Sequence, residues 1–254
     1  MPGSYNRVDV EQVTEWLRAS RRAVAFTGAG ISTESGIPDF RSPGGVWSRT
    51  KPVYYDAFLA SSESRLEYWR QKAETHRDFS DSLPNAGHLV LADWERAGHL
   101  TGVITQNIDG LHQDAGSRRV IELHGTARFV DCLTCDHRHE AEEMVERFLA
   151  AGTPPPCDRC GGITKHATIS FGQPLRPGVF DDAETLCRSA DLMLAIGSSL
   201  VVEPAAGLPR IARTSGARLV ILNRDATPLD DLADERISQS IGKTLREMDT
   251  RLTS

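Results

Sequence analysis

The ten residues from Ala23 to Ser32, AVAFTGAGIS, decide the fold class of this chain. An apolar run from Ala23 to Phe26 is typical of a buried strand, and Gly28-Ala29-Gly30 follows it after a single threonine. A glycine-rich turn between a strand and a helix lets backbone amides approach a diphosphate closely, with the positive end of the helix behind them. The stretch therefore predicts a dinucleotide site at the end of a parallel strand.

This turn departs from the usual dinucleotide fingerprint. That fingerprint is G-x-G-x-x-G, with an acidic residue about twenty positions further on to hold the adenosine ribose. Here the third glycine is Gly36, which comes too late in the chain to fit this pattern. Residues 46–52, where the acidic residue would be expected, contain no Asp or Glu. We therefore expect the dinucleotide to be bound differently from the way dehydrogenases bind it, for different chemistry.

Composition narrows the class of protein. The 254 residues suffice for one large domain with a small satellite. With 25% charged residues and a net charge of -6, the chain lacks the excess of positive charge that is typical of proteins that bind polyanions, which argues against nucleic acid as a partner. Residues 1–9 lack the apolar core of a signal peptide, and nowhere do about 18 apolar residues run together. We predict a cytoplasmic protein without a membrane partner.

Several further segments resemble strands that end in polar residues. The carboxyl ends of such strands meet at one crevice in an α/β sheet, so the expected fold class is α/β with a Rossmann-type parallel sheet. Residues 62–76 read as a helix and Asn85 as the cap of another, both inserted before the second strand. Residues 38–52, rich in Gly, Pro and Ser, read as a loop over the crevice. The strand candidates are residues 103–105, 120–123, 192–196 and 219–222.

Four of the five cysteines form two C-x-x-C pairs, Cys132 with Cys135 and Cys157 with Cys160. Each pair fits a tight knuckle that turns two thiolates toward one ion, and two knuckles complete a tetrahedral zinc site without an open position for a catalytic water. The spacing therefore predicts a structural zinc rather than a redox pair or a disulfide. Cys187 is interpreted as a small buried hydrophobe.

Taken together, the ordered motifs resemble the sirtuin family, and in particular its bacterial-type members. The resemblance implies an NAD-dependent protein-lysine deacylase in which a zinc ribbon and a helical insertion form a small domain. It places the NAD-binding domain at residues 1–42, 86–130 and 167–254, the helical insertion and cofactor loop at 43–85, and the zinc-ribbon part at 131–166. The matching motifs are Gly28–Ser32, Gly36–Ser42, Gln106–Asp109, Leu123–Gly125, the two cysteine pairs, Phe171-Gly172 and Gly197–Leu200.

The reaction implied by the resemblance begins when the acyl oxygen of an acyl-lysine attacks C1′ of the nicotinamide ribose. Nicotinamide leaves as an already cationic group, so its departure needs no general acid. His124 then takes a proton through the ribose hydroxyls, since the pKa of imidazole lies near working pH. The expected products are nicotinamide, deacylated lysine and 2′-O-acyl-ADP-ribose, and acetyl is the simplest acyl group.

The resemblance also assigns residues to the site. His124 and Asn107 are the expected catalytic residues, although a lone histidine at a strand end is ordinarily structural and Asn107-Ile108-Asp109 could simply be a turn that caps a helix. The other seven histidines are interpreted as structural or solvated. The expected NAD contacts are Gly28, Ala29, Gly30, Pro38, Asp39, Phe40, Arg41, Gln106, Asn107, Ile108, Asp109, Gly197, Ser198, Ser199, Asn223, Arg224, Asp225 and Ile241.

The substrate side departs most from the family pattern. Residues 165–173 lack a proline and a glutamate that many members carry, but backbone strand addition tolerates such changes. Members that remove succinyl or malonyl groups carry Tyr-x-x-Arg where this chain has Tyr68 and Gln71, while Trp69 and Lys72 repeat aromatic-x-x-basic in a shifted register. The Tyr-Trp pair resembles a class II branch that includes a mitochondrial sirtuin with broad acyl and lipoyl preferences. The expected substrate contacts are Tyr68, Gln71, Ile169, Phe171 and Gly172.

Other functions remain open at this point. A mono-ADP-ribosyltransferase or an NAD glycohydrolase needs the same pocket without the acyl acceptor, and a deacylase could be specialised for longer or acidic acyl groups. An inactive NAD-sensing or zinc-ribbon interaction module would need no positioned base in its cleft. The leading prediction is a deacylase whose partners are acylated lysines of proteins, with NAD⁺ as co-substrate and Zn²⁺ as a structural ion.

Overall fold

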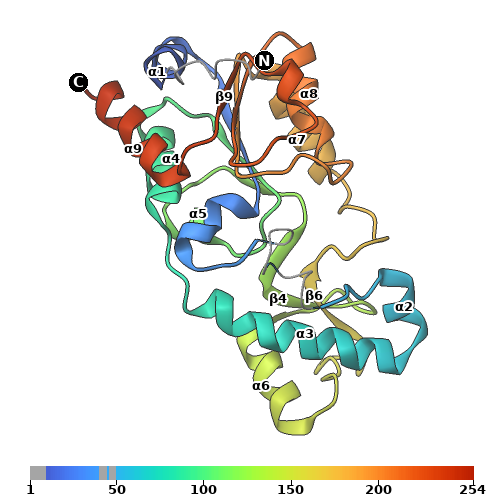
Figure 1. The fold of residues 1–254 in the computed structure, drawn as a ribbon. Helices are drawn as coiled ribbons and strands as arrows, with labels where there is room; N and C mark the ends of the chain where they lie inside the picture. Colours follow the sequence, from blue (N-terminus) through green and yellow to red (C-terminus); the bar gives the residue numbers. More distant parts are fainter. Residues whose placement is uncertain (1–9, 40–44, 46–49) are drawn as a thin grey trace, which may run out of the picture.

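The computed structural model describes residues 10–39, 45 and 50–254. Its larger part is a six-stranded parallel sheet with the strand order β3-β2-β1-β7-β8-β9 (Figure 1). The chain builds outward from β1 in one direction and then, after a long excursion, in the other, as in a Rossmann fold. This confirms the predicted fold class. The strands are β1 (Ala23–Thr27), β2 (Gly102–Thr105), β3 (Val120–Glu122), β7 (Leu192–Ile196), β8 (Arg218–Leu222) and β9 (Glu235–Ile237).

Helices cover both faces of this sheet, because neighbouring side chains of a strand point to opposite faces. Ala23 and Ala25 pack into the core beneath α1, α4 and α9, whereas Val24 and Phe26 pack beneath α7 and α8. Figure 1 shows the first three helices on one side of the sheet and the other two on the opposite side. The helices are α1 (Val10–Ala19), α4 (Ala86–Ala97), α7 (Val179–Ser189), α8 (Gly207–Thr214) and α9 (Ile241–Leu252).

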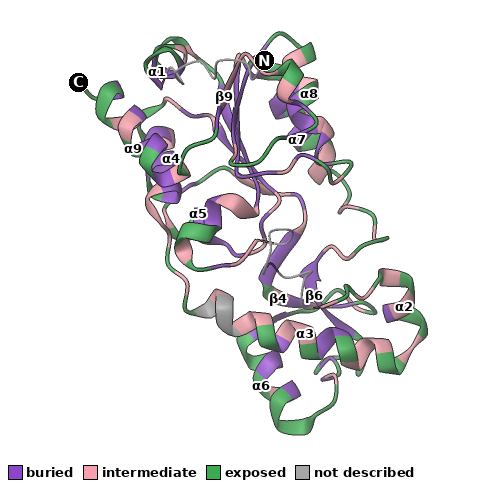
Figure 2. Ribbon diagram, in the orientation of Figure 1, coloured by how far each residue is buried: buried purple, intermediate pink, exposed green. Residues whose placement is uncertain are grey.

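A smaller part of the molecule has its own antiparallel sheet, in the order β5-β4-β6. Helices α2, α3 and α6 pack on it around a core that includes Phe58, Trp69, Val130, Met144 and Phe148. In Figure 2 the buried side of α3 faces this sheet and its exposed side faces outward. The elements are α2 (Tyr55–Ala60), α3 (Ser62–Ser80), β4 (Gly125–Cys132), β5 (Arg138–Glu140), α6 (Ala141–Ala151) and β6 (Thr164–Thr168).

Local signals explain where the inserted helices begin. The Ser61 hydroxyl accepts a hydrogen bond from the Ser64 amide at 3.3 Å, so α3 begins at Ser62 as predicted and continues to Ser80. Asn85 caps α4: its side chain accepts from the Gly87 amide at 2.8 Å, and the His88 ring accepts from the Asn85 amide at 3.3 Å. Both helices lie between β1 and β2, which confirms the predicted insertion.

Three features differ from the expectations or add to them. The glycine turn after β1 enters a 3₁₀ helix, η1 (Ala29–Ser35), rather than a regular α-helix. The short edge strand β9 was not expected, because Glu235 and Arg236 break its apolar pattern. β4 begins at Gly125 and pairs with the smaller sheet, so the chain leaves the large sheet immediately after His124. The remaining short elements are α5 (Leu111–Asp114) and η3 (Asp230–Leu232).

None of the described helices combines the length and the apolar character that crossing a bilayer requires.

Candidate active site

A cleft of about 1050 Å³ lies at the carboxyl ends of the parallel strands and extends to α3 and to the segment after β6. Nearly all the residues predicted to contact NAD or substrate line it; Phe40 and Arg41 lie outside the described residues. The structure thus brings together His124, Gly28, Ala29, Gly30, Pro38, Asp39, Gln106, Asn107, Ile108, Asp109, Gly197, Ser198, Ser199, Asn223, Arg224, Asp225, Ile241, Tyr68, Gln71, Ile169, Phe171 and Gly172.

Glycines allow two loops to touch at the floor of the cleft. The Gly30 amide donates to the Gly197 carbonyl oxygen at 2.8 Å. A Cβ atom at Gly30 would lie 2.7 Å from the Gly197 Cα, and one at Gly28 would lie 2.8 Å from the Gly197 oxygen. Since these are backbone atoms, no side-chain movement would relieve the clash. The glycines after β1 therefore bring the turns after β1 and β7 together, in addition to exposing amides to a ligand.

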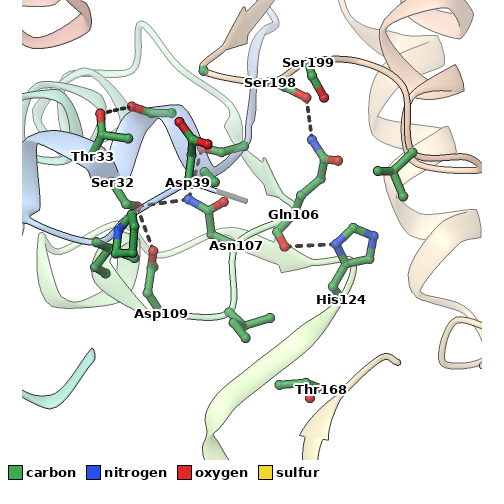
Figure 3. Close-up of a pocket in the computed structure, with 18 of the residues that line it drawn as sticks. Ser32, Thr33, Asp39, Gln106, Asn107, Asp109, His124, Thr168, Ser198 and Ser199 are labelled. Carbon is green, nitrogen blue, oxygen red and sulfur yellow. Dashed lines mark hydrogen bonds between the residues drawn. The ribbon is translucent and has the colours of Figure 1, made fainter. Parts of the chain in front are cut away.

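The Ser32 hydroxyl joins two polar residues of the loop after β2 (Figure 3). It donates to the Asp109 carboxylate at 2.7 Å and accepts from the Asn107 amide nitrogen at 3.1 Å. The Asn107 nitrogen also donates to the Gly28 carbonyl at 3.2 Å, so both of its hydrogens are used. This fixes the orientation of the Asn107 side chain. Asn107 and Asp109 therefore converge on one face, as their alternation with Ile108 predicted.

Asp109 also performs the structural role that sequence reasoning offered as the alternative. Its second carboxylate oxygen accepts from the Leu111 amide at 3.0 Å, where α5 begins. The helix cap and the cleft-facing carboxylate are thus two functions of one side chain, and the two readings are compatible.

His124 lies at the end of β3, where the chain turns into β4. Its Nδ1 is 3.0 Å from the main-chain oxygen of Gln106 (Figure 3). A carbonyl oxygen only accepts hydrogen bonds, so the proton sits on Nδ1 and the neutral ring presents the lone pair of Nε2. Burial lowers the pKa of His124, against the opposing effect of the Gln106 carbonyl. The Gln106 side chain extends to the Ser198 hydroxyl at 2.7 Å.

Two further histidines lie buried behind this cluster. His88 Nε2 is 3.4 Å from the Ser32 hydroxyl, and His112 Nε2 is 2.9 Å from the Thr27 hydroxyl. Their rings meet edge to face at 4.9 Å. Burial lowers the pKa of His88 to about 4 and that of His112 to about 3, so both are neutral near pH 7. They support the cleft wall as uncharged groups, consistent with their interpretation as structural histidines.

The far end of the cleft is formed by the loop after β8. The Asn223 amide nitrogen donates to the Asp225 carbonyl at 2.8 Å, which folds this loop back on itself. Arg224 and Asp225 form an exposed ion pair at 3.1 Å. Ile241, the first residue of α9, lines the same end. Asn223 and Asp225 both line this end of the cleft, and their side chains carry oxygen atoms that can accept hydrogen bonds.

The segment after β6 borders the cleft on the substrate side. The Ile169 amide donates to the His124 carbonyl at 2.8 Å. The Phe171 ring packs against the Tyr54 ring, with the two ring centres 5.8 Å apart. On α3, Tyr68 and Lys72 line the cleft, whereas Trp69 is fully buried in the small core. The shifted aromatic-x-x-basic register is therefore wrong, because Trp69 does not reach the cleft: the aromatic side chain that faces the cleft beside Lys72 is Tyr68, four residues earlier on the same side of the helix.

The four cysteines lie as the spacing predicted. Their sulfur atoms are all within 4.8 Å of one another, with Cys132 and Cys160 at 3.5 Å and Cys135 and Cys157 at 3.8 Å. Tetrahedral zinc with bonds of about 2.3 Å separates its sulfur ligands by about 3.8 Å, so the cluster fits the ion. The cluster begins at the last residue of β4, and none of its cysteines is among the residues that line the cleft, which suits a structural metal rather than a catalytic one.

Comparison with known proteins identifies the family. The model of the Sir2 family matches residues 28–204, which span both the glycine turn and the cysteine cluster. The chain belongs to the Sir2 family. Among its sirtuin relatives, the "NAD-dependent protein deacetylase" of Rhodopseudomonas palustris is 46% identical over 93% of this chain and 94% of that protein. The "NAD-dependent protein deacetylase 1" of Bradyrhizobium diazoefficiens is 47% identical, with 94% of each chain covered.

Solved sirtuin structures have the same fold. A structure described as "Sir2-p53 peptide-NAD+" is 37% identical and covers 97% of this chain and all of the other, with a TM-score of 0.88. Another, "Sir2 bound to acetylated peptide", is 36% identical with the same TM-score, and 96% and 98% of the two chains are covered. The sirtuin fold assigned from the ordered motifs is thus confirmed along nearly the whole chain.

Some residues of this sirtuin cleft were not assigned a site role from the sequence. Ser32 stands inside the quoted glycine motif, but only its hydrogen bonds to Asn107 and Asp109 reveal its position. Thr168 lies at the end of β6, and nothing in its local sequence separates it from an ordinary strand residue. The other unassigned lining residues include Thr33, Glu34, Ile37, Lys72, Thr75, Phe79, Glu203 and Ser240.

Proposed function

We propose that this chain catalyses NAD-dependent deacylation of protein lysines, with acetyl-lysine as the simplest substrate. The observation that carries the proposal is the position of His124, whose proton on Nδ1 is held by Gln106 while Nε2 is left as a base at the wall of the cleft. The names of the relatives as NAD-dependent protein deacetylases support the same activity. NAD⁺ is the co-substrate, and acylated protein lysines are the partners.

In this proposal the Ser32 cluster binds the nicotinamide half of NAD⁺. Asp109 accepts a hydrogen bond from the carboxamide, and Asn107, fixed by Gly28 and Ser32, orients the ribose or a water near C1′. The carboxylate is held on one side by Ser32 and on the other by the start of α5, so it needs little reorganisation when the ligand binds. Pro38, Asp39, Phe40 and Arg41 border or contact the same half, as the family resemblance implies.

The remaining NAD contacts follow the strand ends. The diphosphate and the nearby ribose are proposed to contact Gln106, Gly197, Ser198 and Ser199. The amides and hydroxyls of these residues are uncharged groups that can donate hydrogen bonds to the ligand. Asn223 and its neighbours Arg224 and Asp225 serve the adenosine ribose, and Ile241 flanks the adenine. Gly28, Ala29, Gly30 and Ile108 contribute main-chain contacts.

His124 acts as the general base after nicotinamide has left. Because burial lowers its pKa, the ring is neutral at pH 7 and accepts a proton through the ribose hydroxyls. The peptide is proposed to pair with the backbone of residues 169–172, with Ile169, Phe171 and Gly172 in contact. Tyr68 and Gln71 border the acyl group.

The zinc would hold the smaller part of the molecule together through Cys132, Cys135, Cys157 and Cys160. The domain bounds that the resemblance implies are residues 43–85 and 131–166 for that part and residues 1–42, 86–130 and 167–254 for the NAD-binding domain. We propose them with one adjustment: all of β4 and β6, which these bounds would divide, belong to the smaller part. A cytoplasmic location is proposed because the four clustered cysteines are free thiols, which a reducing compartment preserves.

The test is mass spectrometry of an acetyl-lysine peptide incubated with purified protein, with and without NAD⁺. NAD-dependent loss of the acetyl group, abolished in His124→Ala, supports the proposal. NAD⁺ consumption at the same rate without peptide would instead support the glycohydrolase or ADP-ribosyltransferase alternative. Absence of any NAD⁺ turnover would support a binding module.

A further inference from the structure

The first residues of β4 bind the loop after β2 at two main-chain oxygens. The Ala127 amide donates to the Ile108 carbonyl at 2.8 Å, and the Arg128 guanidinium donates to the Gly110 carbonyl at 3.2 Å. Asp109, the residue between these two carbonyls, lines the cleft. A strand of the smaller sheet thus holds the main chain on both sides of the Asp109 carboxylate.

The Arg128 guanidinium also joins the two ends of α5. It forms an ion pair with Asp114, the last residue of this helix, while Gly110 is the residue that precedes the helix. The Gly110 oxygen accepts from the Asp114 amide at 3.1 Å as well as from Arg128. α5 has only four residues, and a helix this short is unstable in water without tertiary contacts. Arg128 supplies such a contact at both ends.

The guanidinium lies directly against the main chain at Gly110. This glycine has a φ of +76°, a backbone conformation that residues with a side chain rarely adopt. A Cβ atom at Gly110 would lie 2.0 Å from Arg128 Nε and 2.6 Å from Arg128 Cζ, so no side chain fits between the two groups. The contact therefore fixes the conformation of the residue that follows Asp109.

The direction of the Asp109 carboxylate depends on where α5 begins. One of its oxygens accepts from the Leu111 amide at 3.0 Å, and the other accepts from the Ser32 hydroxyl at 2.7 Å. If the start of α5 shifted, the carboxylate would lose one of these bonds or turn with the helix. Arg128 thus acts on Asp109 through Gly110 and α5 without touching the carboxylate.

The ion pair itself contributes little to the stability of the fold. The side chains of Arg128 and Asp114 are 42% and 40% exposed, and ion pairs as open to water as this one typically contribute about 1 kcal/mol or less. The arrangement is better explained by the position that it gives to α5 and Asp109.

We propose that Arg128 is a positioning residue for the nicotinamide half of NAD⁺: it holds Gly110 and α5 so that the Asp109 carboxylate meets the carboxamide. The inference rests on the proposed deacylase function, which assigns Asp109 to the carboxamide. Because β4 belongs to the smaller sheet, the nicotinamide site is completed by a residue from outside the large parallel sheet.

The experiment compares two constants at saturating acetyl-lysine peptide: the KM for NAD⁺ and the Ki of ADP-ribose as an inhibitor that competes with NAD⁺. ADP-ribose lacks only the nicotinamide, so a change confined to the KM reports on that half of the ligand. We expect Arg128→Met to raise the KM by about three- to tenfold and to change the Ki by less than about twofold. Arg128→Lys keeps the charge but not the planar set of donors, so it should recover part of the loss.

A second variant tests the pair from its other side. Asp114→Asn should raise the KM for NAD⁺ in the same direction, and the double variant should exceed Arg128→Met only slightly, because both changes remove one interaction. The matched control is Arg138→Met. The Arg138 side chain lies on the same sheet, is 44% exposed, pairs with Asp131 at 2.8 Å and does not line the cleft. This control should leave both constants unchanged.

The outcomes separate the inference from the proposed function. Equal rises in the KM and the Ki in Arg128→Met would indicate a general loosening of the NAD site and would overturn the positioning role. An unchanged KM would overturn it too, and fully additive effects of the two variants would overturn the pairing with Asp114. Each of these results leaves the deacylase proposal standing if the unmodified protein deacetylates the peptide. Absence of NAD⁺ turnover by the unmodified protein would overturn both.

Discussion

His124 Nδ1 and the Gln106 carbonyl oxygen lie 3.0 Å apart, which orients the ring and leaves Nε2 as the base. His124→Ala is therefore expected to lower the deacylation rate by about a hundredfold or more, the usual contribution of a general base. His99→Ala, which changes a histidine outside the cleft, is the control. Measured kcat for an acetyl peptide checks this, and an unimpaired His124→Ala would contradict the assignment.

The pH dependence should follow the lowered pKa of His124. Because burial favours the neutral ring, the base form persists to lower pH than for a free imidazole, and activity falls only when the pH drops through the folded-state pKa. We expect the acidic limb of kcat against pH to lie below about 6.5, the ordinary value for histidine. A limb centred above that value would show that another group, or a charged His124, controls the step.

The hydrogen bonds of Ser32 lead to a prediction about NAD⁺ affinity. Ser32→Ala removes the donor to Asp109 and the acceptor for Asn107, leaving both side chains less well fixed. We expect the KM for NAD⁺ to rise by about tenfold, corresponding to the loss of a hydrogen bond to a charged group. Ser62→Ala, at an exposed position on α3, is the control. An unchanged KM would mean that this cluster does not contact the nicotinamide half.

The contact between Gly30 and Gly197 leads to a prediction about the glycine turn. In Gly30→Ala the new methyl group would meet the Gly197 backbone at 2.7 Å, so the two loops must separate. We expect the free energy of unfolding to fall by about 1–3 kcal/mol, with weaker NAD⁺ binding as well. Gly152→Ala meets no atom within 4 Å and adds only the strain of its positive φ. Equal destabilisation of the two variants in urea would contradict the packing argument.

The buried Lys165 ammonium should destabilise the fold. Its pKa is about 7 in the folded protein and near 10.5 when unfolded, so the unfolded chain binds more protons between these values and stability rises with pH across that window. Lys165→Met should raise the free energy of unfolding at pH 7 by about 2 kcal/mol and reduce this pH dependence. Lys243→Met, at an exposed position, is the control. A destabilised Lys165→Met would contradict the argument.

Zinc removal should affect the smaller part of the molecule first. If the four sulfur atoms bind zinc, a strong chelator should release one ion per chain and loosen β4, β5 and β6, with activity lost as a consequence. Metal analysis and hydrogen exchange of these strands would measure both effects. Retention of full activity by metal-free protein would contradict a structural role for the ion.

Much of the large sheet was predictable because its strands are short, apolar and followed by polar loops, as in Leu192–Ile196. The cysteine cluster was predictable because a tetrahedral site restricts ligand spacing. The sequence did not reveal β9, whose charged residues break the apolar pattern, or the true partner of Lys72. That partner is Tyr68 rather than Trp69, because Trp69 is buried in the small core while the Lys72 ammonium lies over the Tyr68 ring.

Asn107 and Asp109 show how much of the candidate site a local sequence pattern can predict. Their alternation predicted a shared face, but the third member of the cluster, Ser32, comes from the 3₁₀ helix η1, 75 residues earlier in the chain. Contacts of that kind depend on the register between strands, which no local pattern contains.

The most direct test of the central claim is the stoichiometry of the reaction with an acetyl-lysine peptide. The account predicts that one nicotinamide is released for each lysine deacylated and that the acetyl group is recovered on ADP-ribose. Deacetylation that yields free acetate without nicotinamide, or nicotinamide release unrelated to the amount of peptide deacetylated, would contradict it.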